Sequence, residues 1–443
     1  MKRLVLCFDG TWNAVVSPKT VTNVVRLANL VTVSDDQGVD QITYYNSGVG
    51  SGGAVDRFLG GAFGMGLKAN VKRGLAFLAL NYNDGDEIYL FGFSRGGYTA
   101  RALAGVLGTA GIPLDISETE EHWQLYQRIA KLKDQRGRFE RSSKRRAPYD
   151  QQIEALQGEL DDVTRYKGED LPIECVGVWD TVGAYGIPSG FANGIIPRFF
   201  TYWTRGFRDT RIGDKVRVGL HAVAIDEMRR PFVPTFWTVR VDKEPAEEQE
   251  VEQVWFPGVH SNVGGGYDNT GLSDLALAWM ISRVQEKTGL QFNDLEVMST
   301  VWPCAAGTLY RSSSGGMFTR VRDILPGDIS LIRSRMRRLW KWLAGQEADV
   351  KIKRINEKLH WSVQERCNWQ TTLVDGLGKR RYAPANLKPH IKEVAERTEL
   401  EQRLLDRGRN WAKKCAIEEA GFECECARNA AAAASAQRSS TAA

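Results

Sequence analysis

Four runs of largely apolar residues stand out along the chain, and each one leads into a glycine-rich or polar loop. The runs cover Arg3–Phe8, Asp86–Phe93, Ile173–Trp179 and Val251–Phe256. Their apolar residues are continuous and do not alternate with polar ones, which is typical of strands that are buried on both faces of a sheet. We therefore predict that these four segments are strands of a covered sheet.

Residues with helical spacing of apolar positions lie between these strands. The predicted helices cover Gly66–Asn81, Gly96–Gly108 and Leu275–Gln285. Strands that alternate with helices favour an α/β fold with a largely parallel sheet, because a parallel connection needs a crossover segment. We predict a mostly parallel sheet flanked by helices.

The strand and helix alternation is interrupted once and then ends. Residues 118–167 are strongly charged and helix-prone, so we predict a helical insertion there. After residue 291 the sequence becomes mixed, basic and rich in tryptophan. We predict an α/β domain over 1–291, a partly helical C-terminal extension over 292–427, and a disordered Ala/Ser-rich tail over 428–443.

Composition narrows the classes of function. The chain has 443 residues, 42% hydrophobic content and a net charge of +5, which fits a globular protein with a sizeable core. The charge is small for this length and no nucleic-acid-binding motif is present, so we expect no nucleic-acid partner. The seven cysteines show neither metal spacing nor a disulfide framework, which indicates a reducing compartment. We expect no cofactor and no metal.

The N-terminal segment does not have the pattern of a secretory leader. It reads "MKRLVLCFDG", and its apolar run breaks at Asp9, too early for a signal peptide. No stretch approaches the roughly 18 apolar residues that a membrane span needs. We therefore expect a chain made in the cytoplasm, with export by a leaderless route left open.

Ser94 is the first candidate for chemistry. It lies in Gly92-Phe93-Ser94-Arg95-Gly96, after a predicted strand and before a predicted helix. This order is that of a nucleophile elbow, in which flanking glycines make room for a strained turn that exposes the serine hydroxyl. The alternative is an ordinary Gly-Ser turn in which Ser94 caps the helix.

A serine needs a base to remove its proton and an acid to orient that base. His260 is the best base, because it follows the last predicted strand and precedes three glycines. Asp180 is the best acid, because it ends the strand Ile173–Trp179, and Asp226 is the alternative acid. The order serine, acid, histidine is that of the α/β-hydrolases. Each residue also has an ordinary structural explanation, such as a capped turn or a histidine bonded to a backbone carbonyl.

The other four histidines are weaker candidates. His221 lies within an apolar run and is more typical of a satisfied core residue. The remaining three follow no predicted strand: they are His122, His360 and His390.

An oxyanion hole needs two backbone N–H donors. The residue after the nucleophile, Arg95, is one, and a loop after an early strand supplies the other. The loop "DGTWN" places Gly10 and Thr11 after the first strand, although an ordinary Asp-Gly turn would have the same sequence.

Dinucleotide binding is an alternative function. Gly48, Gly50 and Gly53 match the spacing of a dinucleotide-binding loop after the strand-like segment "QITYYN". That fingerprint also needs an acidic residue about 20 positions later, and none is present between Lys68 and Arg73. We interpret the glycines as a flexible loop near the site.

The motifs together resemble a known family, the α/β-hydrolase catalytic domain of type VI secretion lipase effectors of the first group. The resemblance rests on "CFDGTWN", "NYNDGDEIYLFGFSRGGYTAR", "VGVWDTVGAYG", "HAVAIDEMRRPFVP" and "VWFPGVHSNVGGGY". It implies a triad at Ser94, Asp180 and His260, cleavage of phospholipid esters, and antibacterial action after export by type VI secretion. It also implies a partner in the secretion apparatus or an immunity protein. The chain departs from the family at Gly97, where alanine is frequent, and nothing after about Gln291 is recognised.

The sequence therefore predicts a serine ester hydrolase that acts on phospholipid or other lipid acyl esters. A housekeeping carboxylesterase for small esters and a non-catalytic adaptor with the same fold are the alternatives. A membrane contact is predicted at Ser330–Gly345, where apolar residues follow one helical face, arginines cover much of the rest and no acidic residue occurs. A surface helix packed on the domain would show the same pattern.

Overall fold

A parallel sheet forms the centre of the protein. The computed structural model describes residues 1–10, 21–48, 62–137, 139, 143–168, 170–182, 212–229, 232–240, 249–310, 352–368, 372–374, 378–380, 382, 384 and 393–414. Thr11, His390, the segment Ser330–Gly345 and the tail 428–443 lie outside these residues. No helix in the described ranges is both long enough and apolar enough to span a bilayer.

The central sheet has eight strands in the described residues, and every neighbouring pair is parallel. Its spatial order is β14 (Val394–Ala395), β11 (Glu357–His360), β9 (Glu250–Phe256), β7 (Val216–Ala224), β6 (Ile173–Trp179), β3 (Glu87–Phe93), β1 (Arg3–Phe8) and β2 (Gln41–Asn46). The predicted strands and the predicted fold class, an α/β-hydrolase-like parallel sheet flanked by helices, are confirmed. A sheet of this kind gathers the carboxyl ends of its strands along one edge.

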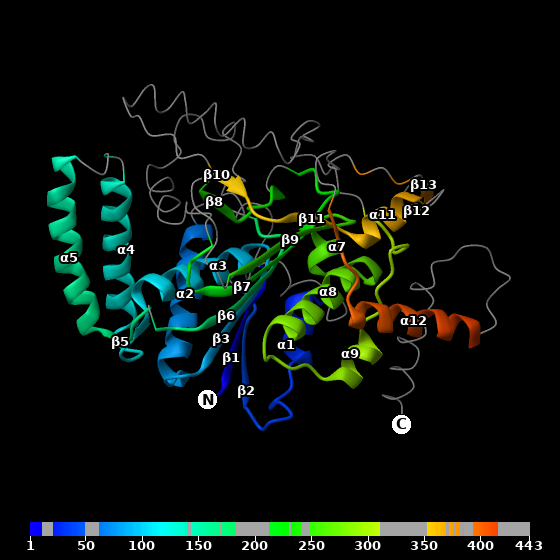
Figure 1. Cartoon of the computed structure of the whole chain (residues 1–443), viewed down its shortest axis with the longest axis horizontal. Coiled ribbons are helices and arrows are strands. Elements are labelled where there is room, and N and C mark those ends of the chain that lie inside the picture. The colour runs from blue at the N-terminus through cyan, green and yellow to red at the C-terminus, as the bar shows by residue number, and fades with distance from the viewer. Residues whose placement is uncertain are drawn as a thin grey trace.

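Helices cover both faces of this sheet (Figure 1). On one face lie α2 (Ala62–Asn81) and α3 (Arg95–Ala110), which pack against the strand side chains Leu4, Leu6 and Phe8. On the other face lie α1 (Asn23–Leu30) and α8 (Gly271–Lys287), which pack against Val5 and Cys7. Successive strand residues point to opposite faces, so a strand covered on both sides must be apolar throughout. This requirement explains why continuous apolar runs in the sequence predict the strands.

The insertion after α3 forms a helical hairpin that projects to one side of the molecule (Figure 1). Its helices are α4 (Thr119–Arg136) and α5 (Ala147–Asp162), joined through the short 3-10 helix η2 (Lys144–Arg146). The antiparallel strands β4 (Ile112–Pro113) and β5 (Thr164–Tyr166) close its base. His122 lies at this base, where its Nε2 atom is 2.9 Å from the carbonyl of Ala110, at the far end of α3 from Ser94.

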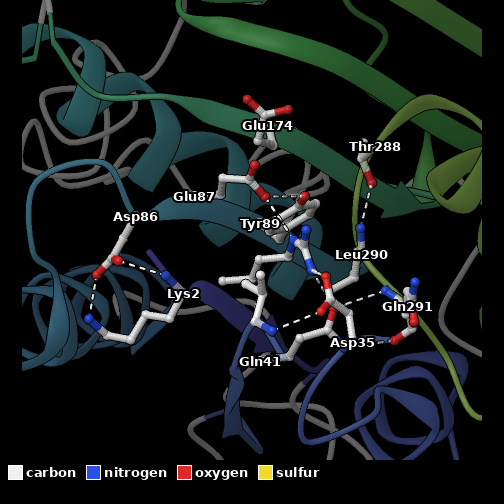
Figure 2. Close-up of polar contacts among 12 residues, drawn as sticks. Lys2, Asp35, Gln41, Asp86, Glu87, Tyr89, Glu174, Thr288, Leu290 and Gln291 are labelled. Atoms are coloured by element: carbon white, nitrogen blue, oxygen red, sulfur yellow. Dashed lines mark hydrogen bonds and ion pairs between the residues drawn. The ribbon is translucent and has the colours of Figure 1, made fainter. Parts of the chain in front are cut away.

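The amino-terminal edge of the sheet is held by a polar network (Figure 2). The Arg3 guanidinium bonds the Asp35 carboxylate at 2.6 Å and the Glu87 carboxylate at 2.9 Å. The Tyr89 hydroxyl also donates to Glu87, at 2.9 Å. These contacts tie β1, β3 and the segment before β2 together. They fix the strands at the edge opposite the candidate residues.

Strands β11 and β14 and helix α12, all after residue 352, belong to the same sheet and core. Strand β11 pairs with β9, and the Gln253 side-chain amide donates to the Ile355 carbonyl at 2.8 Å. The long helix α12 (Glu399–Lys414) packs against α8, and its buried Glu401 accepts a hydrogen bond from Trp361 Nε1 at 2.9 Å. The domain boundary at residue 291 stays a prediction, but the extension supplies strands and core to the α/β unit.

The remaining elements of the described chain are short. They are α7 (His260–Gly264), α9 (Asp294–Thr300), α11 (Trp361–Asn368), β8 (Thr238–Arg240), β10 (Ile352–Arg354), β12 (Thr372–Val374) and β13 (Gly378–Arg380).

A chain that ends at residue 291 should not fold stably. Truncation would expose the edge of β9 and remove buried side chains such as Leu359, Leu400 and Leu404. Each buried leucine contributes about 2–5 kcal/mol, against a typical total stability of about 5–15 kcal/mol. We expect aggregation or loss of the cooperative unfolding transition by circular dichroism. A truncated chain that unfolds cooperatively near the full-length melting temperature would contradict this account.

Candidate functional site

Three side chains from distant parts of the sequence meet at the carboxyl edge of the sheet. Ser94 follows β3, Asp180 follows β6, and His260 begins α7 four residues after β9. His260 Nε2 lies 2.8 Å from Ser94 Oγ, and His260 Nδ1 lies 2.6 Å from Asp180 Oδ2. With the Nδ1–H donating to Asp180, the Nε2 atom accepts the Ser94 O–H. The structure thus brings the predicted nucleophile, base and acid into one hydrogen-bonded chain.

Ser94 occupies a strained turn between β3 and α3. Its backbone has φ 58° and ψ −119°, which side-chain-bearing residues rarely adopt. Although Ser94 stands at the N-cap position of α3, its side chain makes no capping hydrogen bond and instead contacts His260. Helix capping therefore does not explain why a serine hydroxyl occupies this position.

The two glycines of the motif are required by close backbone contacts. A Cβ atom at Gly96 would lie 2.0 Å from the Phe8 carbonyl oxygen, and one at Gly92 would lie 2.4 Å from the Gly96 backbone. Helix α3 can therefore approach β1 and β3 only because these positions lack side chains. That approach places the amino end of α3 under Ser94.

Asp180 is fully buried and held by backbone donors. The Ala224 N–H donates to its Oδ1 atom at 3.0 Å, and its own N–H donates to the Ala222 carbonyl at 2.7 Å. Its φ of 35° is also in the left-handed region. Burial raises the pKa of Asp180, while the hydrogen bond and charge of His260 and the Ala224 N–H lower it. The imidazole and the Ala224 N–H therefore stabilise the charged carboxylate, but burial has the larger effect and the pKa of Asp180 is raised overall.

His221 lies beside the acid and not in the hydrogen-bonded chain. Its Nε2 atom accepts the N–H of Thr181 at 3.2 Å, and its Nδ1 atom is 3.4 Å from Gln253 Oε1. Accepting at Nε2 requires a neutral ring with the proton on Nδ1. Burial lowers the pKa of His221 to about 3. His221 thus supports the Asp180 turn from within the core.

The surroundings of His260 include residues that the sequence analysis did not single out. The ring lies between Phe93 and Phe232, with centroid distances of 4.6 and 4.7 Å. The His260 backbone N–H donates to Glu227 at 3.2 Å, and Glu227 pairs with Arg229 at 2.8 Å. Glu227, Arg229 and Phe232 lie within the quoted segment "HAVAIDEMRRPFVP", and Phe93 precedes Ser94, but no local pattern indicates that they surround His260.

One predicted oxyanion donor stands at the start of α3, and another lies beside the serine. Arg95 is the first residue of helix α3 and directly follows Ser94. A Cβ atom at Gly10 would lie 3.4 Å from Ser94 Cβ, so the Gly10 backbone is close to the hydroxyl. The Gly10 N–H donates to the Asp9 carboxylate at 2.6 Å. A substrate oxygen would have to compete with that carboxylate for this donor.

The other candidates lie away from Ser94. Asp226, the alternative acid, accepts hydrogen bonds from the Gly258 N–H and the Tyr382 hydroxyl. His360 contacts Glu401 at 2.7 Å and Ser362 at 2.6 Å, but Ser362 has no exposed surface, whereas Ser94 keeps 8% of its surface exposed. The part of the chain that the structure describes holds no group of three or more His, Cys, Asp or Glu side chains suited to a metal ion.

Gly97 should not tolerate the alanine that is frequent in the resembled family. A Cβ atom there would lie 2.6 Å from Thr181 Oγ1, next to the strained Asp180. Gly97→Ala should lower the free energy of unfolding by about 1–3 kcal/mol, partly offset by about 1 kcal/mol of helix propensity. Adding Thr181→Ala should recover most of the loss in denaturant unfolding. Additive effects of the two substitutions would contradict this contact.

His221 should stay neutral in the folded protein well below pH 6. The unfolded chain takes up a proton near pH 6.5, whereas the folded chain resists it. The stability that His221 contributes is therefore complete at neutral pH and is lost as the pH falls below about 6.5. Nitrogen-15 NMR of the imidazole, assigned with a His221→Gln variant, measures this directly. Protonation of the folded protein between pH 6 and 7 would disprove the buried, neutral assignment.

Comparison with known proteins identifies the family of the chain. Residues 2–283 match a family model described as the T6SS phospholipase effector Tle1-like catalytic domain. The uncharacterized protein YEL023C of Saccharomyces cerevisiae (strain ATCC 204508 / S288c) is 30% identical over 250 residues, which are 52% of this chain. This chain spans 32% of the length of that yeast protein.

Two solved structures share weaker similarity. One is an uncharacterized protein from Pseudomonas aeruginosa, with 21% identity, a TM-score of 0.39, and coverage of 68% of this chain and 48% of the other. The second is the Tle1 effector bound to the VgrG spike of the type 6 secretion system, with 18% identity, a TM-score of 0.29, and coverage of 61% and 52%. Since the family match covers well over half of the sequence, the chain belongs to the Tle1-like phospholipase effectors of type VI secretion.

Proposed function

We propose that this protein is a serine hydrolase that cleaves acyl esters of phospholipids with Ser94, His260 and Asp180. The observation that carries the proposal is the continuous set of contacts from Ser94 Oγ through the imidazole to the Asp180 carboxylate. Membership of a phospholipase effector family supports hydrolysis of lipid as the activity. The resemblance also supports delivery by type VI secretion, which makes a secretion-apparatus partner part of the proposal.

Each residue has a defined role in the proposed reaction. Ser94 Oγ attacks the ester carbonyl carbon while its proton passes to His260 Nε2. The tetrahedral intermediate collapses, the C–O bond to the alcohol breaks, and His260 Nε2–H returns the proton to the leaving oxygen. Water, deprotonated by His260, then attacks the acyl carbon. The bond from that carbon to Ser94 Oγ breaks, His260 Nε2–H returns the proton to Oγ, and the fatty acid is released. Asp180 holds the ring through Nδ1–H and stabilises the imidazolium.

Backbone N–H groups stabilise the oxyanion in this proposal. Arg95 supplies one at the amino end of α3, where the helix dipole also favours negative charge. The loop after β1 supplies the second through Gly10 or Thr11. Losing one such donor costs other serine hydrolases about 3 kcal/mol of transition-state stabilisation.

The two alternative functions predict different results with ester substrates. A housekeeping esterase would turn over short acyl esters but not phospholipid vesicles. An adaptor with this fold would hydrolyse neither. The strained backbone at Ser94 favours an enzyme, because such strain is costly and clusters at functional sites.

Products identified by mass spectrometry test this proposal. Purified protein should release fatty acid from mixed phospholipid vesicles, and Ser94→Ala should abolish release while the circular dichroism spectrum stays unchanged. Asp180→Asn should lower kcat by about 10³–10⁴-fold, because it favours the wrong imidazole tautomer. Ser34→Ala is the matched control, because it makes the same substitution away from the site. It should release fatty acid at the wild-type rate. Undiminished release by Ser94→Ala would refute the mechanism.

A further inference from the structure

The loop that carries His260 is anchored by a side chain from far along the sequence. Asp226 Oδ2 accepts the Gly258 N–H at 2.7 Å and the Tyr382 hydroxyl at 2.8 Å. The Asp226 N–H donates to the Gly258 carbonyl at 3.0 Å. Both backbone polar groups of Gly258 are thus held by Asp226, and Tyr382 holds the same carboxylate oxygen. Gly258 lies two residues before His260.

The conformation of this loop depends on the hydrogen bonds that hold the Gly258 backbone. Its φ of 120° is a conformation that only glycine adopts readily, and a Cβ atom there would lie 2.3 Å from Asn262 Cβ. Glycine has little conformational preference of its own, so the backbone angles at Gly258 depend on its hydrogen-bond partners. A small rotation at this residue would swing the His260 ring away from Ser94 and Asp180.

Tyr382 is itself held in place by a buried cation. The Arg366 guanidinium lies over the Tyr382 ring, 5.0 Å from its centroid. Arg366 Nη1 donates to the carbonyls of Ala305 and Gly307, at 2.6 and 2.8 Å, and its side chain is fully buried. The Tyr382 hydroxyl therefore reaches Asp226 from a fixed ring.

The hydroxyl keeps its proton. Burial, together with the charge of Asp226 and the hydrogen bond to it, raises the pKa of Tyr382 well above its ordinary value. Tyr382 therefore remains a donor to Asp226 throughout the working pH range of a histidine base. Burial raises the pKa of Asp226; when its carboxyl group is ionised, the neutral donor and the carboxylate form a charge-assisted hydrogen bond, which is among the stronger kinds.

We propose that Tyr382 is a positioning residue for His260, acting through Asp226 and the Gly258 backbone. The inference rests on the proposed function of His260 as the base. Tyr382 lies outside residues 2–283, the span of the family match, so a segment beyond the recognised catalytic domain completes the site. It also gives Asp226, the rejected acid, a defined role in orienting the base.

Tyr382→Phe tests the proposal, because it removes the hydroxyl and leaves the ring against Arg366. We expect kcat for phospholipid hydrolysis to fall by about tenfold to a hundredfold, as for other small displacements of catalytic groups, with KM within twofold of wild type. The downfield NMR signal of the His260 Nδ1–H proton should shift or broaden. A purely structural role would lower the melting temperature without changing either readout at temperatures where the protein is folded.

Tyr89→Phe is the matched control. Tyr89 is also buried and donates its hydroxyl to a carboxylate, that of Glu87, but at the opposite edge of the sheet (Figure 2). This variant should keep the wild-type kcat and the wild-type Nδ1–H signal. If Tyr382→Phe fails to fold, Asp226→Asn weakens the same two hydrogen bonds at nearly constant volume and should lower kcat in the same way.

The outcomes separate this inference from the function on which it rests. Wild-type kcat in folded Tyr382→Phe, with Ser94→Ala inactive, would overturn the positioning role alone. The same holds for wild-type kcat in Asp226→Asn. Full activity in Ser94→Ala would overturn the proposed function. A kcat loss in Tyr382→Phe that Tyr89→Phe shares would show a general stability effect and would also overturn the proposal.

Discussion

The buried hydrogen bond between His260 and Asp180 is the contact on which the rest of the site depends. Asp180 is inaccessible to solvent, and an ionised carboxylate without a partner is costly in such a place. The imidazole at 2.6 Å and the Ala224 N–H at 3.0 Å supply its partners. The same contact fixes the ring tautomer, so the nitrogen facing Ser94 is free to accept a proton. Stabilisation of the buried charge and orientation of the imidazole ring are therefore two consequences of one interaction.

That contact exists because a parallel sheet brings the ends of its strands together. β3, β6 and β9 are far apart in sequence, yet their carboxyl ends lie along one edge. Glycines then allow the close approaches: Gly96 lets α3 lie against Phe8, and Gly264 sits where a Cβ atom would be 2.0 Å from the Phe93 ring. The polar network around Arg3 holds the opposite edge. The geometry of the site is thus set by the sheet and by a few backbone contacts.

The sequence predicts those features that depend on neighbouring residues alone. Continuous apolar runs marked strands buried on both faces, and the elbow glycines marked the turn at Ser94. The strands β11 and β14 were missed because two to four residues in a mixed segment give no periodic signal. Glu227 and Tyr382 were missed because their importance lies in contacts with distant parts of the chain. The recognised family region and the physically complete α/β unit therefore differ, since the core, the sheet edge and the anchor of the His260 loop all draw on residues after 352.

The central claim is that Ser94 is the activated nucleophile, and covalent labelling tests it most directly. A fluorophosphonate reacts with a serine whose proton is taken up by a neighbouring base. Peptide mass mapping of the labelled protein should place a single adduct on Ser94, and His260→Ala should abolish it in the folded chain. Absence of labelling, or an adduct on a different residue, would contradict the account.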